Sequence, residues 1–284
     1  MNKIGIVVCG NSGIDYLEHP YDIRVLRSTL LFGNDEYTDF VDIKADEFYT
    51  MLRENPELTP RTAQTATGVI LQTYETMRDE GYEEIIVITI SSKLSGTFEG
   101  AKMAANMVEG VKVTVFDSLS VAYAETHMAL EASRLAKEGR NTTAILDHLY
   151  RIRENQGLYI SVDTLKFLVK NGRLSGASGF LGSLLKIKPT LHLTREGKIE
   201  AVEKIRTRQK AINRIVEKFL QDHPETEIEV FIVHAHAGET VDQVRKMLLE
   251  GRPELKTIND YPLTPVVGAH AGPDALAIGW IKKV

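Results

Sequence analysis

Residues 83–101, EEIIVITISSKLSGTFEGA, decide the fold because they read as a buried strand that passes directly into a helix. The β-branched run is followed by five hydroxyl or glycine residues within the seven positions 91–97. At the carboxyl end of a parallel strand, free backbone N–H groups and the helix dipole converge on one point, where α/β proteins bind ligands. The stretch therefore predicts an α/β fold with an anion-binding loop.

Two other runs in the first half resemble the strand at 83–90. They are KIGIVV at 3–8 and VKVTVFD at 111–117. Between them, Ile70, Tyr74 and Met77 fall on one face of a helix. Strands that alternate with amphipathic helices are typical of a parallel sheet covered by helices.

The second half has a different pattern. Two short strands meet around TREGK at 194–198, which predicts an antiparallel hairpin. Ile212, Ile215 and Phe219 share a helical face, and IEVFIVHA at 228–235 reads as another strand. We therefore predict a two-domain α/β protein. Residues 1–160 form a parallel-sheet domain with the anion-binding loops, and residues 161–284 form a second α/β domain with a mixed sheet, the boundary being set to within about ten residues.

Composition excludes several classes of protein. The 284 residues carry 34 basic and 39 acidic side chains, a net charge of -5, so nucleic acid is not the expected partner. Cys9 is the one cysteine, which excludes an internal disulfide. No apolar run approaches the roughly 18 residues of a membrane span, and we expect a cytoplasmic protein. The chain also lacks the Walker A and Rossmann glycine motifs, so we expect no nucleotide cofactor.

Three loops carry candidate ligand-binding side chains. In the first, Ser92 and Ser95 either bind an anion or cap the following helix, and the loop alone leaves both readings open. The second loop places Thr62, with two further threonines, before an amphipathic helix. In the third, His270 stands between glycines at 268 and 272, which allow the backbone to approach another surface closely.

Two enzyme classes remain as alternatives. His234 and His236 in HAHAG have a spacing that suits a metal site, although no third ligand appears at a telling distance. A hydrolase would use Ser95 as nucleophile and His270 as base, but the sequence shows no obvious acid to orient the histidine.

Six ordered motifs across nearly the whole chain resemble the DegV family of bacterial fatty-acid-binding proteins. The motifs are EYTDFVDI, TPRTAQTAT, ISSKLSGTFEGA, KNGRLSG, LLKIKPTL and GAHAGPDALAIGW. The resemblance implies a protein that is not itself an enzyme and has no cofactor. Such a protein buries one long-chain fatty acid and presents its carboxylate to a separate ATP-using kinase subunit, which forms an acyl phosphate for phospholipid synthesis.

The resemblance also implies which residues bind the ligand. The family's carboxylate contacts fall on Thr62, Ser95 and His270, with Ser92 as a weaker candidate, and Arg173 matches the basic residue beside the head group. The apolar segment GFLGSLLKI offers side chains to line a tunnel for the acyl tail. They are Phe180, Leu181, Leu184, Leu185 and Ile187.

Overall fold

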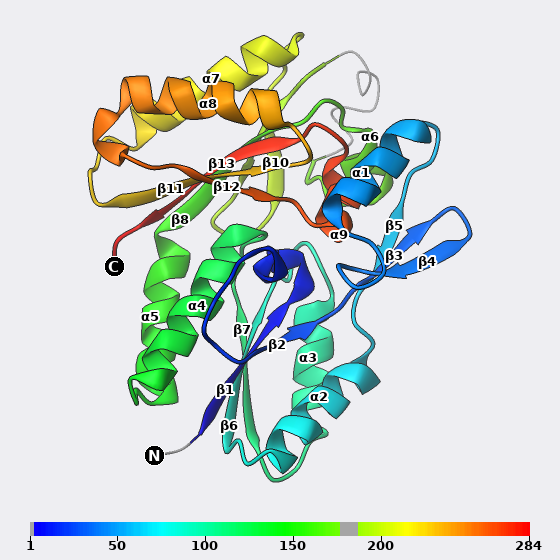
Figure 1. Ribbon diagram of the computed structural model, residues 1–284, viewed down its shortest axis with the longest axis vertical. Helices are drawn as coiled ribbons and strands as arrows, with labels where there is room; N and C mark the ends of the chain where they lie inside the picture. The colour runs from blue at the N-terminus through cyan, green and yellow to red at the C-terminus, as the bar shows by residue number, and fades with distance from the viewer. Residues whose placement is uncertain (1–2, 177–186) are drawn as a thin grey trace.

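The computed structural model describes residues 3–176 and 187–284. Two α/β units lie one above the other in Figure 1, with the N-terminal unit at the bottom. Within the described ranges, none of the helices combines the length and apolar character that a membrane crossing requires.

The first sheet is parallel and has the strand order β2-β1-β6-β7. Its strands are β1 (Ile4–Cys9), β2 (Ile23–Leu26), β6 (Glu84–Thr89) and β7 (Lys112–Asp117). Val7 and Val87 pack under one pair of helices, whereas Val8 and Ile88 belong to the core on the opposite face. The central strands β1 and β6 are buried on both faces and are therefore almost continuously hydrophobic. The parallel sheet predicted from the three strand patterns is confirmed.

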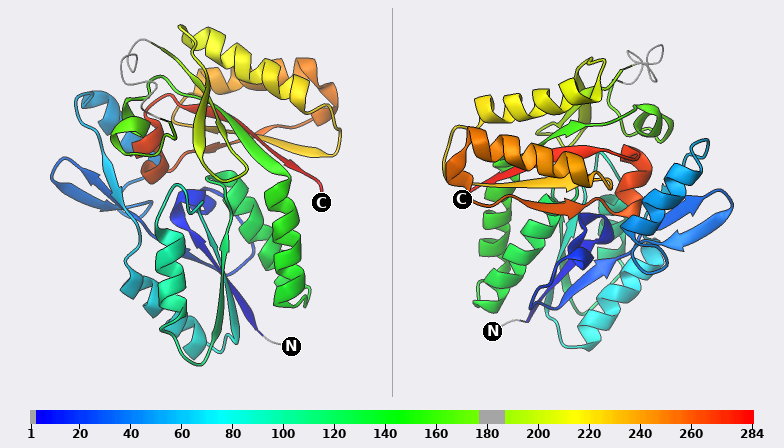
Figure 2. Two further views of the ribbon diagram at one scale, coloured as in Figure 1. Left: turned by 180° about the vertical axis from the view of Figure 1, so that it is seen from behind. Right: turned by 45° about the horizontal axis from the view of Figure 1, so that its top comes forward.

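Four helices cover this sheet, two on each face (Figures 1 and 2). They are α2 (Thr67–Asp79), α3 (Thr97–Ala105), α4 (Tyr123–Lys137) and α5 (Thr142–Glu154). In α2, Ile70, Tyr74 and Met77 are buried against the sheet, as their spacing predicts.

The second sheet is mixed and has the order β10-β9-β8-β13-β11-β12. Its strands are β8 (Gln156–Ser161), β9 (Thr190–Leu193), β10 (Ile199–Glu203), β11 (Ile228–His234), β12 (Asn259–Pro262) and β13 (Leu276–Lys282). Strands β11 and β12 are parallel, and the other pairings are antiparallel. The hairpin predicted around residues 194–198 is β9–β10. The first strand of this sheet, β8, begins before residue 160.

Successive side chains along these strands point to opposite faces of the sheet and pack into two different cores. Val230 and Ile232 face α7 (Arg208–Asp222) and α8 (Gly238–Gly251), which cover the outer face of the second sheet. Phe231 and Val233 point the other way, into the core shared with the N-terminal unit. The inner face of the second sheet is therefore turned toward the first domain.

Smaller elements fill the side of the molecule between the two units (Figure 1). A three-stranded antiparallel sheet, which sequence reasoning did not predict, has the order β4-β3-β5. Its strands are β3 (Thr29–Phe32), β4 (Asp35–Thr38) and β5 (Arg61–Ala63), and beside them lie α1 (Ala45–Glu54), α6 (Lys166–Lys170) and α9 (Pro265–Ala271). These elements position Thr62 and His270.

Candidate functional site

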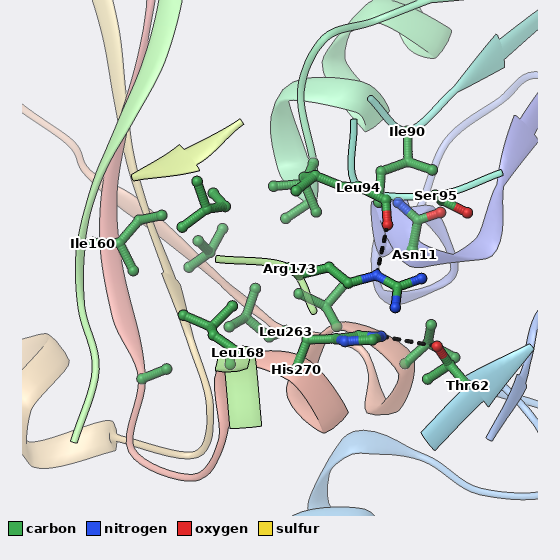
Figure 3. A pocket seen from close by; sticks show the side chains of 18 of the residues that line it. Asn11, Thr62, Ile90, Leu94, Ser95, Ile160, Leu168, Arg173, Leu263 and His270 are labelled. Carbon is green, nitrogen blue, oxygen red and sulfur yellow. Dashed lines mark hydrogen bonds between the residues drawn. The ribbon is translucent and has the colours of Figure 1, made fainter. Parts of the chain in front are cut away.

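A cavity of about 270 Å³ lies between the inner face of the second sheet and the loops of the N-terminal domain (Figure 3). One end is lined by side chains of strands in the second sheet. These side chains are Leu158, Ile160, Leu191, Ile199, Val233 and Ala277. All six are aliphatic, so this end offers no hydrogen bond from a side chain.

The other end of the cavity is polar, and separate segments of the chain contribute to it. Thr62 comes from β5, Ser95 from the loop before α3, Arg173 from the segment after α6, and His270 from α9. In Figure 3 the Arg173 guanidinium lies between the loop that carries Ser95 and the pair formed by His270 and Thr62. The structure therefore brings together four of the five polar residues that the sequence analysis assigned to the head group of the ligand.

His270 is held at this end by a short helix with a well-formed start. Pro265 occupies the first turn of α9, and the Thr264 side chain accepts a hydrogen bond from the Val267 N–H. Gly268 allows α9 to approach α1 closely, because a Cβ there would overlap the Tyr49 hydroxyl. The glycine beside the histidine thus serves a close contact, as its place in the sequence predicts.

The His270 imidazole is neutral at physiological pH. Burial, reinforced by the positive charge of Arg173, lowers its pKa from 6.5 to about 4. Its Nε2 lies 2.8 Å from Thr62 Oγ1. Its Nδ1 is buried and has no hydrogen-bond partner among the described residues. The ring is therefore an uncharged hydrogen-bonding group, and Thr62 orients it.

Ser95 combines the two roles that its loop suggested. Its Oγ accepts a hydrogen bond from the Thr97 N–H at 3.2 Å and lies 2.9 Å from Thr97 Oγ1, so it stabilises the start of α3. The same side chain lines the cavity. Because an oxygen that accepts from an N–H still has its own proton to donate, capping and ligand binding do not exclude each other.

Arg173 supplies a positive charge at the polar end. Its Nε donates to the Leu94 carbonyl at 3.0 Å, and its Nη1 donates to the Asn171 carbonyl at 2.5 Å. Both acceptors are neutral, so the guanidinium keeps its net charge beside the cavity. An anion at this end would lie against a fixed cation.

Neither Ser92 nor the described part of the proposed tunnel segment lines the cavity. Ser92 is not among the residues that line the cavity, and its backbone N–H donates to Asp117 at 3.1 Å. Phe180, Leu181, Leu184 and Leu185 lie outside the described residues, whereas Ile187 is buried in the main core.

Sequence reasoning missed Asn11, which also lines the polar end. Asn11 follows β1, and its Nδ2 donates to Glu125 Oε2 at 2.7 Å. Glu125 is fully buried, and burial raises the pKa of its carboxyl group. The rule that located Ser95, a polar loop at the carboxyl end of a parallel strand, applies equally to GNSG at 10–13 and would have found Asn11.

Among the described residues, the side chains named for the two enzyme alternatives are not arranged as a metal site or as a nucleophile–base pair. His234 Nε2 pairs with Asp260 at 3.1 Å, whereas His236 Nδ1 pairs with Asp46 at 3.2 Å. In the part of the chain that the structure describes, no group of three or more His, Cys, Asp or Glu side chains is placed to hold a metal. Ser95 and His270 are bonded to Thr97 and Thr62 rather than to each other, so no nucleophile–base pair is formed.

Known proteins share both the sequence and the fold of this chain. The family model described as "Uncharacterised protein, DegV family" matches residues 3–283. A DegV domain-containing protein of Staphylococcus aureus is 35% identical, covering 99% of this chain and 98% of that protein. The crystal structure of DegV from Bacillus subtilis, described as a fatty acid binding protein, is 31% identical with a TM-score of 0.88, and each chain is covered completely.

A second solved structure has a lower sequence identity to this chain. A DegV family protein from Thermus thermophilus, whose description reports fatty acid binding, is 28% identical with a TM-score of 0.88. The alignment covers 99% of this chain and 100% of that one. The likeness therefore extends over both α/β units.

Proposed function

The chain belongs to the DegV family, and we propose that it binds one long-chain fatty acid in the cavity between its two units. The carboxylate lies at the polar end, against Thr62, Ser95 and His270 with Arg173 beside them, and the acyl tail runs along the inner face of the second sheet. The observation that carries the proposal is the division of one cavity into a polar end and an entirely aliphatic end. A long-chain fatty acid has the same two parts.

Burial of the tail supplies most of the binding free energy. A sixteen-carbon acid has about fourteen methylene groups, and full burial at about 0.8 kcal/mol each stabilises the complex by on the order of 10 kcal/mol before the costs of association. The head group then needs to be positioned more than it needs to be tightly bound. Hydroxyl groups and a neutral imidazole suit that task because they donate hydrogen bonds without neutralising the carboxylate.

We further propose that the bound carboxylate is presented to an ATP-using kinase subunit, which converts it to an acyl phosphate in the cytoplasm. Two observations support this role. The sequence contains neither the G-x-x-x-x-G-K-[ST] nor the G-x-G-x-x-G pattern, so it offers no familiar means of binding ATP. The Arg173 guanidinium lies at the polar end of the cavity, beside the site proposed for the carboxylate, where a positive charge would stabilise negative charge that builds up on that group.

Native mass spectrometry of the purified protein tests fatty acid binding directly. We expect an adduct with the mass of a long-chain carboxylic acid, released on denaturation. Ile160→Trp should reduce the amount of adduct, because the indole fills part of the aliphatic end. Val202→Trp is the matched control, because Val202 is 43% exposed on β10 and does not line the cavity. An unliganded parent protein that also fails to take up added hexadecanoate would overturn the proposal.

The kinase role needs a separate test with a reconstituted kinase subunit. Arg173→Ala should reduce acyl phosphate formation more than it reduces fatty acid binding, because binding depends mainly on the tail. Formation of acyl phosphate from ATP by the pure protein, with no second subunit, would contradict the carrier role.

A further inference from the structure

The β9–β10 hairpin contacts the loop that carries Ser95. In Figure 2 (left) the hairpin descends from the second sheet toward the N-terminal domain. Leu191 on β9 and Ile199 on β10 line the cavity, so the same hairpin also walls the aliphatic end. Its tip is a tight turn in which the Gly197 N–H donates to the Thr194 carbonyl at 2.9 Å.

The tip is fastened to the N-terminal domain through Ser91. The buried Ser91 hydroxyl donates to the Gly197 carbonyl at 2.7 Å. Gly197 has φ +78°, and a Cβ there would lie 3.0 Å from Ser91 Cβ and 3.1 Å from the Leu119 Cα. Only glycine fits this backbone conformation and this close approach without strain.

Ser91 also stabilises the loop that carries Ser95, which we call the carboxylate loop. Its Oγ accepts a hydrogen bond from the Lys93 N–H at 3.2 Å. Its carbonyl accepts from the N–H groups of Leu94 at 2.9 Å and Ser95 at 3.1 Å. A single residue therefore holds both the hairpin tip and the turn that carries Ser95.

A second connection joins the same two parts through Arg173. The Ser175 N–H donates to the Ile199 carbonyl of the hairpin at 2.9 Å. Two residues earlier, Arg173 Nε donates to the Leu94 carbonyl, as Figure 3 shows. The hairpin thus reaches the carboxylate loop by two routes, one through Ser91 and one through Arg173.

We propose that Ser91 is a positioning residue for the fatty acid head group. By holding the hairpin tip of the second domain against the loop of the first, it fixes Ser95 at the distance from Thr62 and His270 that a carboxylate requires. This inference rests on the proposed fatty acid binding. It assigns a role in recognising the head group to a residue that does not line the cavity.

Comparing an acid with the corresponding alcohol separates positioning of the head group from burial of the tail. Binding of hexadecanoate and of 1-hexadecanol would be measured by displacement of a fluorescent fatty acid from the parent protein and from Ser91→Ala. We expect Ser91→Ala to weaken hexadecanoate binding about tenfold, because hydrogen bonds to the charged group are misplaced. Binding of hexadecanol should change by no more than about twofold.

Two further variants complete the test. Ser133→Ala is the matched control, because Ser133 is also a buried serine whose Oγ donates to a backbone carbonyl, that of Ala129, but it lies within α4 and does not line the cavity. Gly197→Ala displaces the hairpin from the opposite side of the contact while Ser91 keeps its hydroxyl. It also preserves the test if Ser91→Ala fails to fold.

The outcomes are distinct. Loss of acid binding in both Ser91→Ala and Gly197→Ala, with alcohol binding unchanged and Ser133→Ala unaffected, supports the proposal. An equal loss for acid and alcohol, or no effect of Gly197→Ala, overturns it, since Ser91 would then stabilise only its own loop or the cavity wall. A parent protein that binds neither ligand would overturn the proposed function itself.

Discussion

At the polar end of the cavity, the side chains come from separate segments of the chain, whereas the aliphatic end is lined by neighbouring strands of one sheet. The polar end depends on loops that hydrogen bonds join across the two domains, as from the Arg173 side chain to the Leu94 carbonyl. The aliphatic end depends only on the alternation of side chains along strands. The difference indicates that the two ends contribute different things to binding, with affinity coming from the sheet and selectivity for the head group from the loops.

Shortening the ligand should cause the largest loss of affinity, because it removes contacts with the aliphatic end of the cavity. Replacing hexadecanoate by dodecanoate removes four methylene groups, which at about 0.8 kcal/mol each weakens binding roughly 200-fold. Titration calorimetry with both acids measures the ratio. The same shortening should cost less in Ile160→Trp, where the indole already fills part of the space. A loss of less than about tenfold in the parent protein would show that the tail is not buried along this sheet.

Lowering the pH should reduce the free energy of unfolding through protonation of His270 at the polar end. The folded protein holds this imidazole neutral, with a pKa lowered from 6.5 to about 4, so the unfolded chain takes up a proton more readily. Its contribution to stability is complete above pH 6.5 and is lost as the pH falls toward 4, by roughly 3 kcal/mol in the limit.

Urea unfolding from pH 7 to pH 4 measures this loss against a variant that does not titrate at this position. We expect His270→Gln, whose amide can still bond to Thr62, to lose less stability over this range than the parent. Parallel pH profiles for the two proteins would show that His270 does not remain neutral in the fold.

Ser95→Ala tests whether the hydroxyl that starts α3 also binds the ligand. A hydrogen bond to a charged group is worth about 1.5 to 3 kcal/mol, so hexadecanoate binding should weaken roughly ten- to a hundredfold. The free energy of unfolding should fall by about 1 kcal/mol as well, because the Thr97 N–H loses its acceptor. Thr62→Ala and His270→Ala should weaken binding similarly without affecting the start of α3. Lower stability with unchanged binding would leave Ser95 as a cap alone.

The sequence predicted the polar end better than the aliphatic end, for a physical reason. The hydroxyl-rich loops and the histidine between two glycines offered several candidates, and the resemblance to the DegV family singled out Thr62, Ser95 and His270 among them before the structure was known. Aliphatic residues such as Leu158 and Ile160 look the same whether they fill a core or line a cavity. The aliphatic end therefore became visible only when the inner face of the second sheet was seen opposite the loops.

The fold, too, was predicted only in part from the sequence. Continuous apolar runs identified the parallel sheet, and the pattern around residues 194–198 identified the β9–β10 hairpin. The β4-β3-β5 sheet was missed because its strands have only three or four residues each, too few for a period to show. The contact of Ser91 with Gly197 joins positions that are 106 apart, so no local pattern could reveal it.

Ser92→Ala should have the smallest effect on ligand binding, and it allows two serines of the carboxylate loop to be compared directly. Ser92 and Ser95 lie in the same loop and would receive the same substitution, but only Ser95 lines the cavity. The bond from Ser92 to Asp117 uses the backbone N–H, which alanine retains. Hexadecanoate affinity should therefore stay within about twofold of the parent value, measured beside Ser95→Ala under the same conditions. If Ser92→Ala weakened binding as much as Ser95→Ala does, the serines would act by shaping the loop, and backbone N–H groups rather than the Ser95 hydroxyl would hold the carboxylate.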